Sequence, residues 1–532
     1  MSEDPSGFKR IFDDLKRRKV FRVAAVYAVG AWVLVQIADA TFEPLNLPEW
    51  SASLVVWLLI LGFPIAMILA WVLDITPEGI KVTPAAEPET DQPPTQPATR
   101  PSSEPSIAVL PFADMSPEKD QDHFCEGMSE EIINALAKIR EVHVASRTSS
   151  FQFKDTNMDI EAIGHQMKVN TVLEGSVRKA GGQLRVTAQL INVEDGFHIW
   201  SESFDRELKD VFGIQKEIAE SVAHAFKLTL TDTESRAIER QPTDNIEAYE
   251  YYLRGRRHFF QLSESGWARS REEFSRAIEL DPDYALAFAG LADCFSFLYM
   301  YADSSASNRL QAETNSRLAL QLEPDLAAVH VSRGLALSLG HRYEEAENAF
   351  NRAVEIDPKL FDAYYFHARQ AFAQGKFEQA AELFEKASDV RPDDYQAISL
   401  LAQVYRTLGR EEERTAACQR TLEAIEKHLV TNPNDSRALC FGSRNLFEDG
   451  RDELGTEWLQ RAIDVDPDDA MNLYNVACVY SCTGKVEEAL DALERSVGKG
   501  MAEVDWMVND SDLDNLRDHP RFKRLLIGAG GA

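Results

Sequence analysis

The stretch RAVEIDPKLFDAYYFHARQAFAQGKFEQAAELFEKASDVRPDD, which covers Arg352–Asp394, contains one pattern twice. Ala353 and Pro358 are followed, 34 residues later, by Ala387 and Pro392. A constant period of this length is typical of chains in which each helical unit buries its apolar face against the next unit. The stretch therefore predicts that this part of the chain is an array of stacked, repeated helical pairs.

The same spacing extends over the C-terminal half of the sequence. A proline that ends a short turn recurs at intervals of 42, 34, 34, 41 and 34 residues, namely at Pro282, Pro324, Pro358, Pro392, Pro433 and Pro467. A period of 34 is that of the tetratricopeptide helix-turn-helix unit. The two longer intervals predict inserts of eight and seven residues, around Tyr299–Asn308 and Leu422–Leu429. We expect an all-α tetratricopeptide solenoid of about six units over residues 245–500.

A curved solenoid of this kind binds peptides or proteins on its concave face, which the first helix of each unit mainly forms. Aligning the units on Pro358 and Pro392 predicts which side chains point to that face. The predicted partner-contacting residues are Asp362, Tyr365, Arg369, Phe372, Gln396, Ser399, Gln403 and Arg406. The alternative is that some of these side chains only pack within the solenoid or are solvated.

The last stretch of the sequence, residues 501–532, breaks the period. We expect it to form a capping pair of helices, because the final unit of a solenoid needs a cover for its exposed apolar face. The apolar residues expected to cover that face are Trp506, Leu513, Leu516, Phe522 and Leu525.

The N-terminal end of the sequence has the pattern of a membrane anchor. Residues 1–22 are basic and amphipathic, and residues 23–80 contain two apolar runs that predict spans at about 20–42 and 54–73. Seven lysines and arginines precede the first run, whereas the loop TFEPLNLPEWSAS between the runs has none. The positive-inside rule then places the N-terminus and everything after the second span in the cytoplasm of a bacterium, at its inner membrane. A cleaved signal peptide ending at Ala38-Asp39-Ala40 is the alternative.

Residues 81–105 are rich in proline and poor in apolar residues, so we expect an extended linker there. Residues 106–230 then alternate between strand and helix patterns. The expected elements are strands at 106–112, 142–147, 171–178, 183–193 and 198–204, and helices at 126–139, 159–167 and 210–228. The predicted fold is therefore multi-domain: a two-helix transmembrane hairpin, an α/β domain of order β-α-β-α-β-β-β-α, and the solenoid.

Two segments of this α/β domain resemble a known family. IAVLPFADMSPEKDQDHFCEGMSEEIINALAKIREVHVASRTSSFQFK (107–154) and VLEGSVRKAGGQLRVTAQLINVEDGFHIWSESFDREL (172–208) are similar to the TolB amino-terminal-type domain. The resemblance implies a module that precedes tetratricopeptide repeats in bacterial signalling proteins, often behind an adenylate cyclase or winged-helix DNA-binding domain. Residues 1–105 show neither of those domains, and residues 9–81 resemble the two-span leader of a subgroup of these proteins.

Charge and residue chemistry narrow the function further. The net charge of −31 disfavours a nucleic-acid partner, because so acidic a surface repels phosphates. The six cysteines are scattered, and Cys478 and Cys482, four residues apart on one helical face, have no nearby His or Cys cluster to complete a metal site. No nucleophile and base combine with a third group into a catalytic constellation. We therefore expect no catalytic residues, no metal and no cofactor.

These observations leave three possible functions for the protein. The favoured one is a non-enzymatic scaffold, tethered to the lipid bilayer by two spans, that recruits a cytoplasmic protein or peptide partner in signalling or envelope-related regulation. The alternative is a regulatory protein whose α/β domain senses a ligand or nucleotide. The third and least supported hypothesis is that the protein is an enzyme. The identity of the partner and the oligomeric state do not follow from the sequence.

Overall fold

The computed structural model describes residues 105–529 apart from residues 155, 157 and 502. Of the preceding part it describes only Ala31, Trp57, Leu59, Phe63 and the strands β1 (Leu73–Thr76) and β2 (Gly79–Val82). No helix within these described residues has both the length and the apolar character that a membrane crossing requires.

The predictions for the N-terminal region fall almost wholly outside the described residues. They are the basic segment 1–22, the spans at about 20–42 and 54–73, and the linker 81–105. The strands β1 and β2, which pair in antiparallel register from Leu73 with Val82 to Thr76 with Gly79, were not predicted. The chain divides into two compact units at Arg100 and Pro101, and this hairpin belongs to the first.

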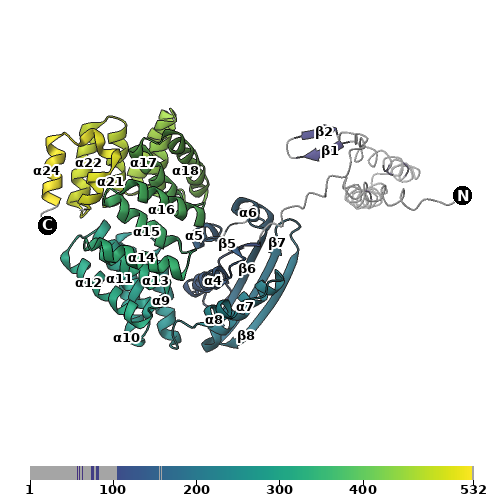
Figure 1. The fold of residues 1–532 in the computed structure, drawn as a ribbon. Coiled ribbons are helices and arrows are strands. Elements are labelled where there is room, and N and C mark those ends of the chain that lie inside the picture. The colour runs from purple at the N-terminus through teal and green to yellow at the C-terminus, as the bar shows by residue number, and fades with distance from the viewer. Residues whose placement is uncertain are drawn as a thin grey trace, which may run out of the picture. The chain divides into compact units, whose positions relative to one another are not determined.

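The second unit begins with an α/β domain built on a six-stranded sheet (Figure 1). The strands lie in the order β5-β3-β6-β7-β8, and β4 pairs with β6. Pairing is parallel among β3, β5 and β6 and antiparallel from β6 through β8. The strands are β3 (Ser106–Val109), β4 (Ala113–Asp114), β5 (His143–Val144), β6 (Thr171–Ala180), β7 (Gln183–Asn192) and β8 (His198–Glu207).

The helices of this domain cover both faces of the sheet. They are α4 (Asp122–Ala137), α5 (Arg147–Phe151), α6 (Ile160–Met167), η1 (Leu208–Asp210) and α7 (Val211–Ala225). Alternate residues of β3 separate the two faces: Ile107 packs in the core beneath α4 and α7, whereas Ala108 packs in the core beneath α6. This alternation is the period of two that a strand buried on both sides requires.

The α/β domain follows the predicted order with local differences. The strand predicted at 106–112 ends at Val109, and a two-residue strand that was not predicted, β4, follows it. The predicted strand at 142–147 is limited to His143–Val144, and a short helix, α5, begins at Arg147. The reason is Ser146, whose side chain accepts a hydrogen bond from the Ser149 backbone N–H and so caps a helix at this point.

A short helix, α8 (Asp232–Glu239), leads into seven antiparallel helix pairs rather than the six that were predicted. The pairs are α9 (Ile246–Phe259) with α10 (Glu264–Leu280), α11 (Ala285–Tyr301) with α12 (Ala306–Leu322), α13 (Ala327–Leu339) with α14 (Tyr343–Ile356), α15 (Phe361–Ala373) with α16 (Phe377–Val390), α17 (Tyr395–Leu408) with α18 (Glu411–Thr431), α19 (Ser436–Glu448) with α20 (Asp452–Val465), and α21 (Ala470–Cys482) with α22 (Val486–Gly498). Six prolines separate seven pairs, and the last pair has no proline after it.

The two inserts lengthen helices instead of forming loops. Helices α11 and α12 have 17 residues each, whereas α13 and α14 have 13 and 14. The second insert is absorbed mainly by α18, which has 21 residues where α16 has 14. Lengthening adds turns in which the backbone groups of the inserted residues pair within the helix, so the inserts need no separate loop structure.

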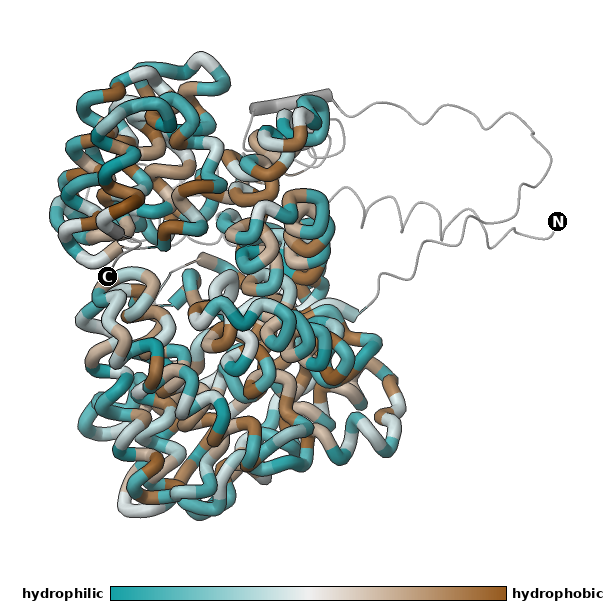
Figure 2. The backbone as a smooth tube through the Cα atoms, turned by 60° about the vertical axis from the view of Figure 1, so that its left-hand side comes forward, coloured by the Kyte–Doolittle hydropathy of each residue, from teal (hydrophilic) through white to brown (hydrophobic). Residues whose placement is uncertain are grey.

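Within a pair, a small residue on the first helix receives an aromatic ring from the second. A Cβ atom added to Gly334 of α13 would lie 2.7 Å from Cε1 of Phe350 on α14. Phe350 is fully buried, so the ring has no room to withdraw. In Figure 2, hydrophobic and hydrophilic positions are interleaved along the visible helices of the array, as expected for helices that bury one face.

The first pair joins the solenoid to the α/β domain, and we call the contact of α4 and α7 with α9 the N-terminal interface. Phe212 of α7 and Tyr249 of α9 place their ring centroids 4.7 Å apart. The Gln215 side-chain amide donates to the Tyr249 hydroxyl over 2.9 Å. Gly127 of α4 allows Leu253 to approach so closely that an added Cβ would lie 2.5 Å from its methyl groups. The α/β domain and the first repeats therefore share one apolar core.

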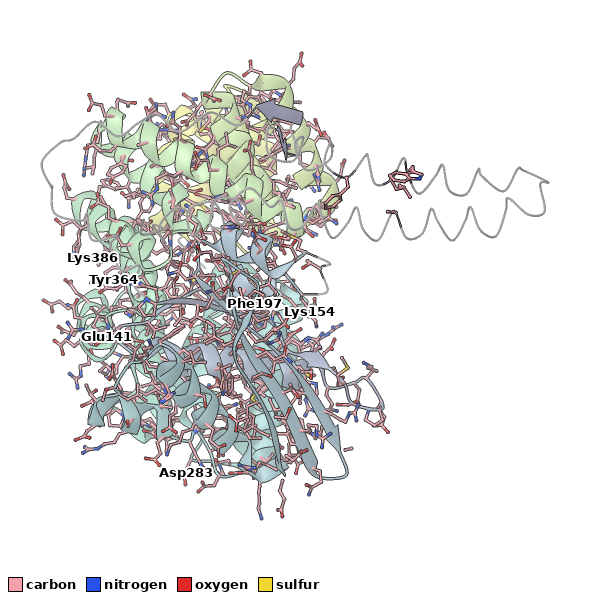
Figure 3. The ribbon with its side chains drawn as sticks, turned by 90° about the vertical axis from the view of Figure 1, so that its right-hand side faces the viewer. Glu141, Lys154, Phe197, Asp283, Tyr364 and Lys386 are labelled. Atoms are coloured by element: carbon pink, nitrogen blue, oxygen red, sulfur yellow. The ribbon has the colours of Figure 1, made fainter. Side chains whose placement is uncertain are left out.

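Charged side chains surround this apolar contact. Glu130 of α4 accepts from Arg147 over 3.0 Å and also pairs with Arg256 of α9. Lys154, whose position is labelled in Figure 3, pairs with Glu126 over 2.8 Å. Each buried carboxylate thus has a cationic partner, which a charge at such a boundary requires.

The C-terminal segment corrects part of the capping prediction. It forms α23 (Val504–Asn509), η2 (Ser511–Leu516) and α24 (Pro520–Ala529). Buried Leu513, Leu516 and Phe522 and the partly buried Leu525 belong to the apolar core that includes the last pair, as a cap requires. Trp506 does not cover that end: it packs on α15, three pairs earlier in the array. The segment before the cap therefore runs back along the solenoid.

Candidate functional site

The first helices of the later pairs, α15, α17, α19 and α21, line one surface, which we call the inner face. This surface is rich in arginine, because α15 contributes Arg369, α17 contributes Arg406, and α19 contributes Arg437 and Arg444. Arg369 and Arg437 lie over aromatic rings, and Arg369, Arg406 and Arg444 pair with carboxylates of residues 503–512. The inner face is thus built to hold negative charge.

The predicted residues of α15 lie on this face but are largely covered. Phe372 is fully buried and Tyr365 is 8% exposed. The Tyr365 hydroxyl lies 3.5 Å from the Gln396 side-chain oxygen, which also accepts from Arg437 over 2.8 Å. Asp362, at the start of α15, is half-buried.

The predicted residues of α17 lie on the same surface. Ser399 and Gln403 are almost fully buried, and the Ser399 carbonyl accepts a hydrogen bond from Arg444. The Gln403 side-chain amide donates to Asp510, and Arg406 pairs with Asp512 over 2.8 Å. The structure therefore brings the predicted residues of α15 and α17 together on one face, and the prediction that they contact a partner protein stays a prediction.

The cover on this face is the chain's own segment 500–512, which we call the inner segment. It starts in a turn against α11: the Ser304 hydroxyl donates to the Gly500 carbonyl over 2.7 Å. Gly500 has a φ of +109°, and an added Cβ would lie 2.0 Å from the Ala302 carbonyl oxygen. Only glycine fits this approach, which places the residue after the last pair against the turn within the second pair.

One aromatic side chain anchors the inner segment on α15. The Trp506 ring lies with its centroid 4.4 Å from that of Phe372, and the Arg369 guanidinium lies 4.5 Å from the Trp506 ring centroid. The same guanidinium pairs with Glu503 over 3.3 Å. A cation held between a ring and a carboxylate gains from both contacts, so Arg369 fixes the start of the segment.

Polar contacts extend along the segment on both sides of this anchor. The Asp505 carboxylate accepts from the Tyr343 hydroxyl over 2.7 Å and lies 3.3 Å from His341. Further on, the Asn509 side-chain amide donates to the Ala373 carbonyl over 2.9 Å. Both side chains and backbone carbonyls of the solenoid therefore bind the segment, as they do in complexes with bound peptides.

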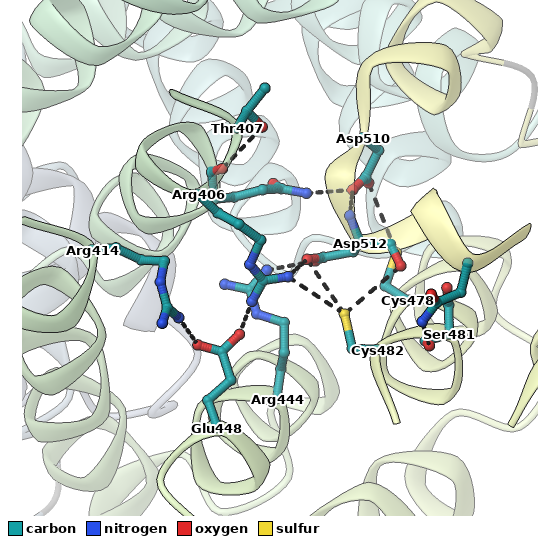
Figure 4. A network of polar contacts seen from close by, with 12 residues as sticks. Arg406, Thr407, Arg414, Arg444, Glu448, Cys478, Ser481, Cys482, Asp510 and Asp512 are labelled. Atoms are coloured by element: carbon teal, nitrogen blue, oxygen red, sulfur yellow. Dashed lines mark hydrogen bonds and ion pairs between the residues drawn. The ribbon is translucent and has the colours of Figure 1, made fainter. Parts of the chain in front are cut away.

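Two buried carboxylates end the segment in a dense network (Figure 4). The Tyr474 hydroxyl donates to Asp510 over 2.6 Å. Asp512 accepts from Arg406 and from Arg444, one guanidinium on each oxygen. Asp510 and Asp512 are 2% and 4% exposed, so neither charge has access to bulk water.

The two carboxyl groups differ in their proton affinity. Burial, together with the negative charge of Asp512, raises the pKa of Asp510 to about 7. Burial alone would also raise the pKa of Asp512, but Arg444 and Arg406 hold it below its usual value. Asp512 is therefore the ionised partner of the arginines, and Asp510 is the group that titrates near neutral pH.

Cys478, Asp510 and Asp512 place donor atoms within 4.8 Å of one another, the spacing of a metal site. Their chemistry argues for another role. Burial and the two carboxylates raise the pKa of the Cys478 thiol well above its usual range, so it stays protonated and donates towards Asp510 over 3.8 Å. Both Asp512 oxygens already accept from guanidinium groups. The cluster is thus best described as a pair of carboxyl groups bound by hydrogen-bond donors of the solenoid rather than as a metal centre.

A cavity of about 50 Å³ remains between the inner face and the inner segment. Arg437, Arg444 and Asn475 line it from the solenoid, and Glu503 and Asp510 line it from the segment. Two donors in its wall, Nε of Arg444 and Nδ2 of Asn475, make no hydrogen bond to any described residue. These two side chains are 5% and 6% exposed.

Sequence reasoning found the inner face but missed its cover. The signal that could have indicated it is charge: the inner segment has four acidic residues within ten positions, Glu503, Asp505, Asp510 and Asp512, facing a surface with four arginines. The capping interpretation considered only the apolar residues of the segment. It therefore assigned Trp506 to the end of the array instead of its inner face.

Comparison with known proteins supports the domain assignment. Residues 102–221 match the family model for the second domain of HilA/YgeH-like transcriptional regulators. Residues 327–360 and 371–428 match models of the tetratricopeptide repeat. The TolB amino-terminal-type resemblance is not among these matches.

Among curated proteins, a putative adenylate cyclase 3 of Rhizobium meliloti is 34% identical over 246 residues, which are 46% of this chain and 42% of that protein. The human protein O-mannosyl-transferase TMTC3 is 26% identical over 185 residues, covering 35% of this chain and 20% of that protein. The chain thus spans less than half the length of each of these relatives.

Among solved structures, the Cut9–Hcn1 hetero-tetramer has a TM-score of 0.38 and 14% identity, covering 60% of this chain and 63% of that one. YrrB, described as a TPR protein with an unusual peptide-binding site, has a TM-score of 0.25 and 20% identity, covering 41% of this chain and 98% of that one. At scores this low the likenesses carry no functional conclusion. What the family models and the fold together establish is a tetratricopeptide solenoid behind an α/β domain, the architecture of a protein-interaction scaffold.

Proposed function

We propose that the protein is a membrane-tethered scaffold that recruits a cytoplasmic protein partner through the inner face of its solenoid. The observation that supports this most directly is the seating of the inner segment. This acidic stretch, which contains the short helix α23 and one aromatic anchor, lies on α15, α17 and α19 through Arg369, Gln403, Arg406 and Arg444, which is how a peptide ligand would lie. The inner face therefore supplies the cationic and amide groups that recognition of an acidic peptide requires.

The tether is proposed from sequence alone. Two apolar runs at about 20–42 and 54–73, with basic residues before them and none between, support a two-pass anchor in the bacterial inner membrane with the solenoid in the cytoplasm. The proline-rich linker at 81–105 would let the soluble part reach partners near the bilayer.

The alternative is a regulatory protein whose α/β domain senses a ligand or nucleotide. The match of residues 102–221 to a domain of transcriptional regulators favours it, as does the relative named as a putative adenylate cyclase. We place it second, because the catalytic constellation of a cyclase was not found in the sequence and the α/β domain packs its helices α4 and α7 against the solenoid. A TolB-type identity for this domain belongs to the same proposal.

The test combines fractionation with proximity labelling of the full-length chain in bacterial cells. We expect the chain to remain in the membrane pellet after carbonate washing and to label a defined set of cytoplasmic proteins. Arg437→Met, which alters the cavity wall without removing a partner of the inner segment, should lose part of that set. Arg420→Met, on an exposed position of α18, is the matched control. Recovery in the soluble fraction would contradict the tether.

A labelled set that Arg437→Met leaves unchanged would contradict recruitment by the inner face. The sensor alternative is tested on the purified chain by its melting temperature in saturating nucleotide. A ligand that binds only the native state must raise that temperature. A specific increase would favour the sensor, and measurable cyclase turnover would overturn the scaffold.

A further inference from the structure

We infer that the inner segment is an internal substitute for the partner, and that the partner displaces it with an acidic peptide carrying one aromatic anchor. The inference rests on the proposed recruiting function and deepens it by assigning the chemistry of the ligand. In the closed chain the inner segment occupies the surface that the ligand needs. Recruitment therefore requires an exchange between a segment of the chain and a segment of another protein.

The ligand chemistry follows from what the inner face already holds. Arg369 takes one carboxylate and one aromatic ring, from Glu503 and Trp506. Arg406 and Arg444 take a second carboxylate, that of Asp512, from two sides. A ligand that replaces the inner segment must supply the same groups, because a guanidinium left buried without a counter-charge is strongly unfavourable.

The inner segment does not satisfy this face completely. Arg437 has the Gln396 amide oxygen at 2.8 Å and the Tyr301 ring at 5.6 Å, but no ion pair with a described carboxylate within 4.0 Å. The cavity beside it contains the two unpartnered donors, Nε of Arg444 and Nδ2 of Asn475, on side chains that are at least nine-tenths buried. A ligand with one more carboxylate, placed in this cavity, would pair with all three groups.

This incomplete fit is what makes exchange favourable. The inner segment has the advantage of being attached, since a short connection gives it an effective concentration in the millimolar range. An external peptide has to compensate for that advantage with better contacts. Residues 500–512, as far as the structure describes them, place no carboxylate against Arg437, Arg444 Nε and Asn475. A ligand that does so gains binding free energy that the internal segment lacks.

The test uses the purified full-length chain and a fluorescein-labelled peptide, KGMAEVDWMVNDSDLDNL, identical to residues 499–516. Trp506→Ala removes the anchor of the inner segment and should let the labelled peptide bind at least about tenfold more tightly than to the unaltered chain. Trp200→Ala, the same change in strand β8, is the matched control and should leave the affinity unchanged. A peptide with asparagine at each aspartate position and glutamine at its glutamate should not bind.

A crosslink provides the second measurement, which remains valid if Trp506→Ala fails to fold. Asn509 contacts the Ala373 carbonyl, so the pair Ala373→Cys and Asn509→Cys would join the inner segment to α15 by a disulfide. The oxidised chain should bind no peptide, and reduction should restore binding. Equal binding by the oxidised and reduced forms would overturn the inference, as would a folded Trp506→Ala chain that binds no better than the unaltered one.

The same crosslink distinguishes this inference from the proposed function. If the oxidised chain captures the same proteins from a lysate as the reduced chain, recruitment exists but does not need the inner face to open. If neither form captures anything and the full chain labels no partner in cells, the recruiting function itself is wrong. If both the recruiting function and the displacement of the inner segment are correct, the reduced form alone should capture the partner proteins.

Discussion

Two of the surfaces that cover the solenoid differ in chemistry. At the N-terminal interface, helices α4 and α7 present apolar side chains to α9, and the contact centres on Phe212, Tyr249 and Leu253. On the inner face, residues 500–512 bury Met501, Trp506 and Met507 but also present carboxylates to arginines, and the polar part of the contact centres on Asp512. The first cover is a core in the ordinary sense, whereas the second resembles a bound ligand.

This difference determines which cover can exchange. Burying apolar surface stabilises by roughly 25 cal/mol per Å² and depends little on salt or pH. Burying ion pairs costs most of what the pairing returns, so the net contribution is small and depends on both partners being present. An apolar cover is therefore permanent, and an ionic cover can be replaced by another segment of the same charge.

The largest effect is expected at the N-terminal interface, from Tyr249→Ala. Tyr249 is fully buried between the α/β domain and the solenoid, so its loss leaves a cavity and an unpaired Gln215 amide. We expect the free energy of unfolding to fall by about 3–5 kcal/mol, measured by urea denaturation. Tyr249→Phe is the control and should cost about 1 kcal/mol, because it removes only the hydroxyl. A loss below about 1 kcal/mol for Tyr249→Ala would show that this cover is not a core.

A smaller and different effect is expected on the inner face, from Arg444→Met. Asp512 then keeps Arg406 as its one cationic partner, and we expect the inner segment to undock at a cost of about 3 kcal/mol while the helix pairs stay folded. Hydrogen exchange of residues 501–512 should rise, and that of α15 should change little. The double variant Arg444→Met with Asp512→Leu should dock again, since no charge is left unpaired and Arg406 keeps Glu448. Equal exchange in the single and double variants would refute the ionic account.

Docking of the inner segment should also depend on pH, with Asp510 as the titrating group. Its pKa is about 7 in the docked state, against an ordinary value of 3.8. Because the docked state binds this proton more tightly, the contribution is present at low pH and is lost as the pH rises through 7. Lowering the pH from 8 to 6 should strengthen docking about tenfold, observed as slower hydrogen exchange of residues 501–512. Asp510→Asn should flatten this dependence, and a flat profile in the unaltered chain would contradict it.

The smallest effect is expected where the α/β domain touches the end of α18. The Thr431 hydroxyl donates to the Gln152 side chain over 3.1 Å at the margin of the contact. Thr431→Ala should cost no more than about 1 kcal/mol and leave the exchange of residues 501–512 unchanged. A larger loss of the free energy of unfolding, measured by urea denaturation, would show that the contact of α18 with the α/β domain also stabilises the fold, and not only the contact at α9.

The sequence predicted the elements that depend on local packing, but not the contacts between distant segments. The helix pairs were predictable because their spacing depends on local packing, such as Phe350 against Gly334 within one pair. The number of pairs was underestimated because the last pair lacks the proline that ended the others. The strand pattern of the α/β domain was predictable from its alternation, apart from the two-residue strand β4 and the short helix that Ser146 starts.

The inner segment was not predictable from periodicity. Its partners are far away in the sequence, as with Asp512 and Arg444 or Glu503 and Arg369, and a non-local ionic contact leaves no periodic signal. The eight predicted inner residues were selected from the repeat register, which fixes their face but not what covers it. The charges of the two regions, acidic in residues 503–512 and basic on α15, α17 and α19, are the signal that could have predicted this contact.

Gly500 has a consequence for the order in which the molecule forms. Each helix pair consists of contacts between neighbours in the chain, and such local structure forms early, while the chain is still being synthesised. The contact of Gly500 with Ala302 and Ser304 joins residues almost two hundred positions apart, so it can form only after the last pair has left the ribosome. A newly made molecule therefore passes through a stage in which the arginines of its inner face are open to solvent. A partner present during synthesis would meet the inner face before the chain's own C-terminus does.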